Sequence, residues 1–164
     1  MKTTFITLCI LCFSVTLFAQ LKTTVKCPVI EVDVLNGIIN HSILPSSTVG
    51  EIKLHLPCFT SFEDESATAK CGGGVSYKKD DVYFFTSRDY VEIGPAFTGK
   101  LSLPLMGASR NNLFHWLGAP QIKEAHWEAF QTSYGILILY YDTADKINKI
   151  QFSSKTAQTI QLCE

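Results

Sequence analysis

This sequence lacks an excess of either positive or negative charge. Its 164 residues include 14 Lys and Arg against 15 Asp and Glu, and the net charge is −1. Because nucleic-acid binding requires a basic surface, the sequence predicts no nucleic-acid partner. The uninterrupted apolar run of about 20 residues that a transmembrane helix requires is also missing. What remains, 46% hydrophobic and 18% charged residues, is typical of a packed globular chain.

The longest apolar run, residues 5–18, follows a single lysine at position 2. This arrangement predicts a signal peptide over residues 1–19, cleaved after Ala19, so that the exported chain begins at Gln20. We expect this chain to be periplasmic or extracellular in a bacterium, with no transmembrane segment after signal cleavage. A buried N-terminal helix or an uncleaved anchor is the alternative interpretation.

Closely spaced cysteine pairs of the Cys-x2–4-Cys kind, which zinc sites usually contain, are absent after residue 19. Four cysteines remain there: Cys27, Cys58, Cys71 and Cys163. An even number in an exported chain predicts two disulfide bonds, and four cysteines allow three pairings. We favour Cys58–Cys71, which bracket a short polar loop, and therefore Cys27–Cys163.

Signatures of catalysis are absent as well. The sequence has no Gly-x-Ser-x-Gly elbow and no His-Glu-x-x-His zinc motif. His126-Trp-Glu128 has the His-x-Glu form of zinc deaminases but lacks their Pro-Cys-x-x-Cys partner. Cys71-Gly-Gly-Gly74 lacks the Lys-Ser/Thr of a phosphate loop, so it predicts a flexible turn beside a disulfide. We therefore expect no enzyme, no metal and no other cofactor.

A degenerate repeat at a spacing of about 61 residues is the most informative pattern present, and it places the two copies at about 29–93 and 97–152. Thr48 and Ser109 are N-cap residues for two short predicted helices. Strand–turn–strand segments follow at 74–85 and 135–152, and Asn36-Gly37 predicts a further hairpin between 28–36 and 38–43. The pattern predicts one α+β domain over 20–164, an antiparallel sheet of two strand–helix–hairpin repeats with short helices on one face. Coincidence between two ordinary stretches is the alternative.

The second copy contains Ser109-Arg-Asn-Asn-Leu-Phe-His-Trp-Leu-Gly-Ala-Pro120, followed by a predicted hairpin over 135–152. This combination resembles the module of BamE-type outer-membrane assembly lipoproteins and of the two-repeat β-lactamase inhibitor proteins. The resemblance covers mainly residues 99–152, and the first copy departs from it with Leu56-Pro57 in place of Leu-Gly-x-Pro. It implies an envelope or secreted domain that binds another protein, and it implies no catalytic residue.

Two groups of residues are candidates for binding a partner. His126, Trp127 and Phe130 lie between the predicted helix and hairpin, where aromatic side chains on a loop can anchor an interface. Glu63, Asp64 and Glu65 form an acidic run that can dock on a basic surface. The alternatives are a loop folded back over the sheet for the first group and a solvated face for the second.

These observations predict an exported inhibitor or immunity protein whose partner is a toxin or an enzyme. A structural or assembly component of the bacterial cell envelope is the second hypothesis. An unrecognised enzyme is the third, and it would use residues among His115, His126, Asp89 and Glu128.

Overall fold

β-Strands, not helices, are the main regular secondary structure of this fold. The computed structural model describes residues 25–66, 68–69 and 71–163, so the predicted signal peptide lies outside the described residues. The chain is 33% strand and 12% helical. The predicted α+β class, built from strand–helix–hairpin repeats with helices on one face, is therefore wrong, because its helices are too short to form a layer. None of the helices in the described ranges has the length and apolar character that crossing a membrane requires.

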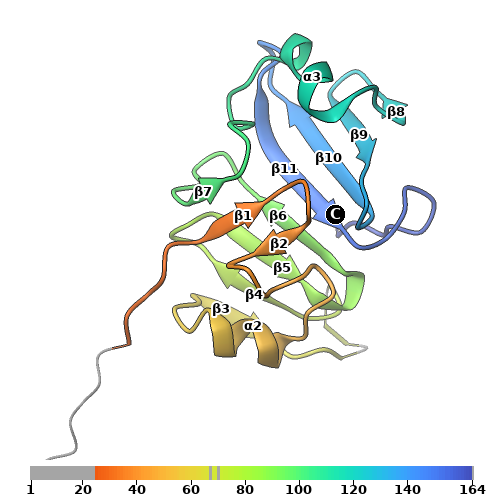
Figure 1. Ribbon diagram of the computed structural model, residues 1–164. Helices are drawn as coiled ribbons and strands as arrows, with labels where there is room; N and C mark the ends of the chain where they lie inside the picture. Colours follow the sequence, from red (N-terminus) through yellow and green to blue (C-terminus); the bar gives the residue numbers. More distant parts are fainter. Residues whose placement is uncertain (1–24, 67, 70, 164) are drawn as a thin grey trace, which may run out of the picture.

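Eight antiparallel strands form the larger sheet (Figure 1). Their order across the sheet is β3 (Ser61–Glu63), β4 (Gly74–Tyr77), β5 (Val82–Phe85), β6 (Tyr90–Ile93), β11 (Ile147–Ser153), β10 (Ile136–Tyr141), β9 (Trp127–Gln131) and β8 (Ile122–Lys123). Strands β3 to β6 form one meander and β8 to β11 form another. The two meanders join at a seam where β6 pairs with β11, with Ile93 opposite Ile150 and Val91 opposite Phe152.

The predicted repeat spacing does not follow the arrangement of these meanders. It aligns residues 74–85, which contain β4 and β5, with residues 135–152, which contain β10 and most of β11. Strand β11 lies at the seam, however, where the first meander contributes β6. Almost any strand that follows a turn has a glycine and then alternating apolar residues. The spacing of about 61 residues therefore matched strands that occupy different positions in the two meanders.

A smaller sheet of three strands has the order β2 (Ile38–Ile39), β1 (Glu31–Asp33) and β7 (Lys100–Leu101). Strands β1 and β2 form an antiparallel hairpin at the predicted place, but both strands are shorter than predicted. A four-residue turn, residues 34–37, joins them, and Gly37 in this turn has a φ of 64°. Strand β7 adds parallel to β1, with the amide of Lys100 bonded to the carbonyl of Ile30.

Both predicted helical segments are helical, but to different extents. Helix α2 (Val49–His55) begins with a capping box in which Thr48 and Glu51 bond each other's backbone amides. The second segment is broken into a 3-10 turn, η2 (Arg110–Asn112), and a single turn, α3 (Phe114–Leu117). Ser109 makes no side-chain capping bond there, and the two asparagines that follow favour turns over helix.

The disulfide bonds join Cys27 to Cys58 and Cys71 to Cys163, with Cα–Cα distances of 5.5 and 5.6 Å. The four cysteines are thus paired as two disulfides, but the favoured Cys58–Cys71 and Cys27–Cys163 pairing is wrong. The segment between Cys58 and Cys71 contains edge strand β3 and is not a simple loop, so it carries the two cysteines apart. Disulfides of this kind are typical of exported proteins.

One face of the larger sheet is covered and holds the main core. Side chains of β4, β5, β6, β9, β10 and β11 pack there against the smaller sheet, α2 and the segment around Leu105 and Leu113. The hydroxyl of Tyr77 donates to the carbonyl of Leu56 at 2.6 Å and fastens α2 to this face. We call the opposite side of the larger sheet the open face.

Candidate partner-binding face

Strand alternation decides which side chains reach the open face. Val82 and Phe84 of β5 lie opposite Ile93 and Val91 and belong to the core. The residues between them therefore point the other way, because successive side chains of a strand lie on opposite faces. By this register the open face carries Ser61, Glu63, Ser76, Tyr83, Phe85, Tyr90, Glu92, Trp127, Ala129, Ile136, Ile138, Tyr140, Lys149, Gln151 and Ser153.

The C-terminal tail, residues 154–163, covers one part of the open face. Its side chains Ala157, Ile160 and Leu162 pack over a small apolar cluster of Ala129, Ile136 and Ile138. A crevice of about 110 Å³ remains between the tail and the sheet. The tail therefore acts as an internal cover for the apolar end of the face.

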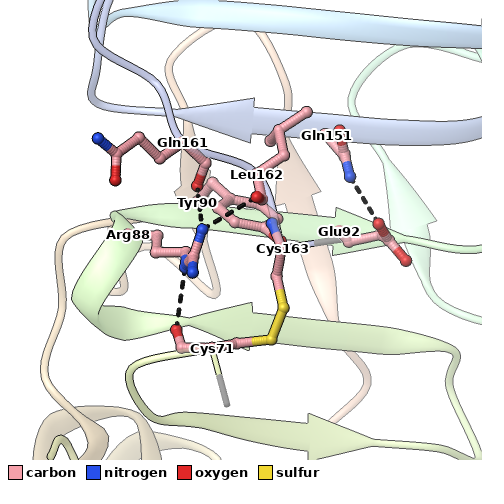
Figure 2. Close-up of a disulfide and its surroundings, with 8 residues drawn as sticks. All are labelled: Cys71, Arg88, Tyr90, Glu92, Gln151, Gln161, Leu162 and Cys163. Carbon is pink, nitrogen blue, oxygen red and sulfur yellow. Dashed lines mark hydrogen bonds between the residues drawn. A yellow bond between two sulfur atoms is a disulfide. The ribbon is translucent and has the colours of Figure 1, made fainter. Parts of the chain in front are cut away.

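A clamp at the end of the tail holds it down (Figure 2). Cys163 is bonded to Cys71, and its amide donates to the Tyr90 hydroxyl at 2.9 Å. The Arg88 guanidinium donates to the carbonyls of Gln161, Leu162 and Cys71. Burial raises the pKa of Tyr90 to about 12, so its hydroxyl stays neutral.

Polar side chains occupy the middle of the open face, across β6, β11 and β10. Gln151 donates to Glu92 at 2.6 Å, as Figure 2 shows, and it accepts a bond from the Tyr140 hydroxyl at 2.8 Å. Lys149 Nζ lies 3.6 Å from Glu92 Oε2 and 4.1 Å from the centre of the Tyr140 ring. This network fixes aromatic and charged groups in one orientation at the surface.

Beside the network, over β3, β4 and β5, the open face is hollowed. The hollow has a volume of about 270 Å³, and Ser61, Glu63, Gly74, Tyr83 and Phe85 are among its lining residues. Phe85 stacks on Tyr90 with ring centres 4.4 Å apart. Burial, together with Asp81 and Glu92, raises the pKa of the Tyr83 phenol, so this aromatic lies in a negative environment.

The glycines at the hollow are required by close packing. Gly73 has a φ of 112°, and a side chain there would meet the backbone of Glu65. A side chain at Gly74 would meet the carbonyl oxygen of Phe84. The predicted flexible turn beside a disulfide is thus a segment in tight contact with its neighbours.

The structure separates the two groups of predicted binding residues. Glu63 lies on edge strand β3, with Asp64 and Glu65 exposed directly after it. Trp127 lies on β9, the seventh strand of the sheet, where it packs against the apolar cluster under the tail, and exposed His126 precedes it. Strand β9 therefore begins at Trp127, where a loop was predicted, and His126 lies just before it.

Phe130 is not available to a partner, because it is only 2% exposed and belongs to the main core. Tyr83 and Phe85, which were not among the predicted binding residues, both reach the open face. The signal that could have found them is the alternation in Val82-Tyr-Phe-Phe85. That signal is weak because all four residues are apolar or aromatic.

Glu128 is the one predicted catalytic candidate that is deeply buried, at 4% exposure. Its carboxylate accepts bonds from Arg110 Nε at 2.9 Å and from the Tyr141 hydroxyl at 2.7 Å. Lys123 lies 3.5 Å away. Burial raises the pKa of Glu128, but these bonds and charges outweigh burial, and the pKa lies below its ordinary value.

The other candidates for catalysis have separate contacts. Asp89 pairs with Lys155 at 2.6 Å, and His115 packs on Trp116. These contacts do not bring an acid, a base and a nucleophile to one place. Within the ranges that the structure describes, no three His, Cys, Asp or Glu side chains are grouped so that they could hold a metal ion.

No family model matches the chain, and no curated protein or solved structure shows significant similarity to it. The resemblance to BamE-type lipoproteins and β-lactamase inhibitor proteins therefore remains an expectation from the sequence.

Proposed function

We propose that this protein acts by binding another protein through the open face, as an exported inhibitor or immunity protein. The observation that carries the proposal is the contrast between the two faces of the larger sheet. The covered face is filled by the smaller sheet and the helices. The open face is crossed by the tail at its apolar end, and half-buried Tyr83, Phe85 and Tyr140 line the rest.

The chemistry of this face suits a protein partner. Aromatic side chains, tyrosine in particular, supply much of the binding energy at protein interfaces. Here they stand on paired strands. The bonds among Tyr140, Gln151 and Glu92 hold Tyr140 in place, and Phe85 stacks on Tyr90. A surface that is already ordered loses little conformational entropy when a partner docks on it.

The acidic run at the edge of the face indicates the charge of the partner. Glu63, Asp64 and Glu65 are exposed on β3 and just beyond it. Complementary charge accelerates association and suppresses wrong partners. We therefore expect a toxin or enzyme with a basic surface, which the protein blocks by covering it and without performing catalysis.

The test is capture of partners by three baits of the full chain, produced in an oxidising compartment and compared by quantitative mass spectrometry. The first bait is the unaltered protein. The second carries Ser76→Arg, which places a bulky charge on the open face. The third carries Leu54→Arg on α2, where the leucine is 77% exposed on the other side of the sheet. We expect a stoichiometric partner that the first and third baits retain and the second loses.

A captured enzyme or toxin must then lose activity when one equivalent of the protein is added. A partner that all three baits retain equally would contradict docking on the open face. Capture of outer-membrane assembly proteins, with no inhibition of any of them, would instead support the second hypothesis of an envelope component.

A further inference from the structure

We propose that the hollow over β3, β4 and β5 receives a cationic side chain, arginine or lysine, presented by the partner. This inference rests on the proposed function, since it names the chemistry by which a partner would be recognised. It draws on the carboxylate, the aromatic rings and the shape of the hollow.

The carboxylate is that of Glu63. Glu63 pairs with Gly74 on β4, and two positions away Ser61 pairs with Ser76, with their hydroxyls 2.7 Å apart. This pairing places the side chains of Ser61 and Glu63 on the open face. Within the described parts of the chain Glu63 forms no ion pair. A carboxylate at the rim of a hollow can accept charge-assisted bonds from an incoming cation.

The aromatic rings are those of Tyr83 and Phe85, which line the hollow from β5. The faces of aromatic rings attract a cation, and arginine also stacks on them. The same chain already uses this chemistry elsewhere, because Lys53 Nζ lies 3.3 Å from the centre of the Phe62 ring and the Arg110 guanidinium lies 4.7 Å from that of Tyr141.

The local charge favours a cation as well. Asp81 and Glu92 both act on Tyr83, and Asp64 and Glu65 follow Glu63. Lys149 already pairs with Glu92, and Arg88 already donates to the backbone carbonyls of Cys71, Gln161 and Leu162. The hollow also has room for such a side chain, because its volume is about 270 Å³.

The experiment is a titration of the full oxidised protein with N-acetyl-arginine methylamide, followed by amide chemical shifts. We expect saturable shifts confined to residues around Ser61, Gly74, Tyr83 and Phe85. The neutral isostere N-acetyl-citrulline methylamide should produce none. Glu63→Gln should weaken binding of the arginine probe about fivefold, as expected for one charge contact near water, while Glu124→Gln at the far end of the sheet should leave it unchanged.

A parallel titration with N-acetyl-lysine methylamide separates recognition of a guanidinium from that of any cation. Saturable binding of either cation that depends on Glu63 supports the proposal. Equal shifts with citrulline, no saturation with either cation, or unchanged binding in Glu63→Gln would each overturn it. Because the probes are small molecules, these results do not depend on the bait comparison. The proposal of a cation site in the hollow can therefore be wrong while a partner still docks on the open face, and docking can be disproved while the hollow still binds a cation.

Discussion

At the scale of single residues, Glu128 shows how this fold stabilises a charge inside a mostly apolar sheet. Arg110 serves as its main partner, and that guanidinium also donates to the carbonyls of Ala125 and Glu124 and lies over the Tyr141 ring. One buried carboxylate thereby ties η2 and the segment before β9 to the sheet. We infer a structural role for Glu128, because both of its oxygens are already engaged.

Glu128→Ala should lower the free energy of unfolding by about 3 kcal/mol at neutral pH, because it leaves a mostly buried guanidinium without its carboxylate. The pKa of Glu128 is lowered in the folded state from an ordinary value of 4.5. Its contribution is therefore complete above the ordinary value and is lost as pH falls through the folded value. Urea unfolding of both proteins should give a difference that shrinks in acid. Exposed Glu124→Ala is the control, and a loss that is equal at all pH values would contradict this role.

Gly74→Ala and Gly50→Ala should change stability in opposite directions. A methyl group at Gly74 would meet the Phe84 carbonyl within the sheet, so we expect a loss of about 2 kcal/mol or more. Gly50 lies in the first turn of α2, where the nearest atom to an added methyl group is 3.9 Å away. Alanine there should add about 0.5 kcal/mol, because it removes the entropy cost of glycine in a helix. Thermal unfolding of both variants checks the pair, and a stable Gly74→Ala variant would show that β4 can move.

The candidate site was only partly predictable from single residues. The acidic run at Glu63 was found because charge stands out in any sequence, and it lies at the surface as expected. Phe130 was misplaced because its neighbours show no alternation, and its burial depends on pairing with Leu137 of β10. Tyr83 and Phe85 could not be assigned to a face without knowing the register of β5 against β6.

At the scale of elements, the C-terminal tail is a strap held over the open face by one covalent bond together with hydrogen bonds and apolar packing. The Cys71–Cys163 bond closes a separation of 92 residues and the Cys27–Cys58 bond one of 31. Loop entropy alone assigns them about 4.5 and about 3.5 kcal/mol of stabilisation. The two bonds are thus expected to contribute similar stabilisation, but only the Cys71–Cys163 bond holds a segment over the open face.

Replacing Cys71 and Cys163 together by serine should release the tail and expose Ile136 and Ile138. We expect higher fluorescence of an apolar dye and faster hydrogen exchange in residues 157–163, which the bond otherwise holds against the open face. The matched control replaces Cys27 and Cys58 by serine, which removes a bond but leaves the tail in place. If both variants bind the dye equally, the dye reports a general loss of stability after removal of any disulfide, and release of the tail is not the cause.

The elements that the sequence predicted well are those specified by local contacts. The hairpin of β1 and β2 follows from Asn36-Gly37, and α2 follows from Thr48 with Glu51 three residues later. The segment after Ser109 has a similar pattern of leucines, but its asparagines and missing cap leave one turn of helix. The end strands β3 and β8 have three and two residues, too few for periodicity to detect.

At the scale of the whole molecule, the sheet order and the disulfide pairing lay beyond the sequence. Both depend on contacts between distant segments, such as β1 with β7 and β6 with β11. The parallel addition of β7 leaves no local signal, because Lys100 and Leu101 form only two residues of strand. Antiparallel pairing and apolar alternation were predictable, whereas the joining of two meanders into one sheet was not.

That joining predicts that the two halves unfold together. The seam places Ile150 against Ile93, both fully buried, so neither meander can keep its core when the other opens. Both tryptophans, Trp116 and Trp127, lie in the second half, so their fluorescence reports that half alone. Hydrogen exchange at Val75 and Phe84 reports the first half. With the disulfides intact, both measurements should give the same free energy of unfolding, and Ile150→Ala should lower both by about 3 kcal/mol. If Ile150→Ala lowered the free energy of unfolding measured by fluorescence but not that measured by hydrogen exchange, the two meanders would be independent units.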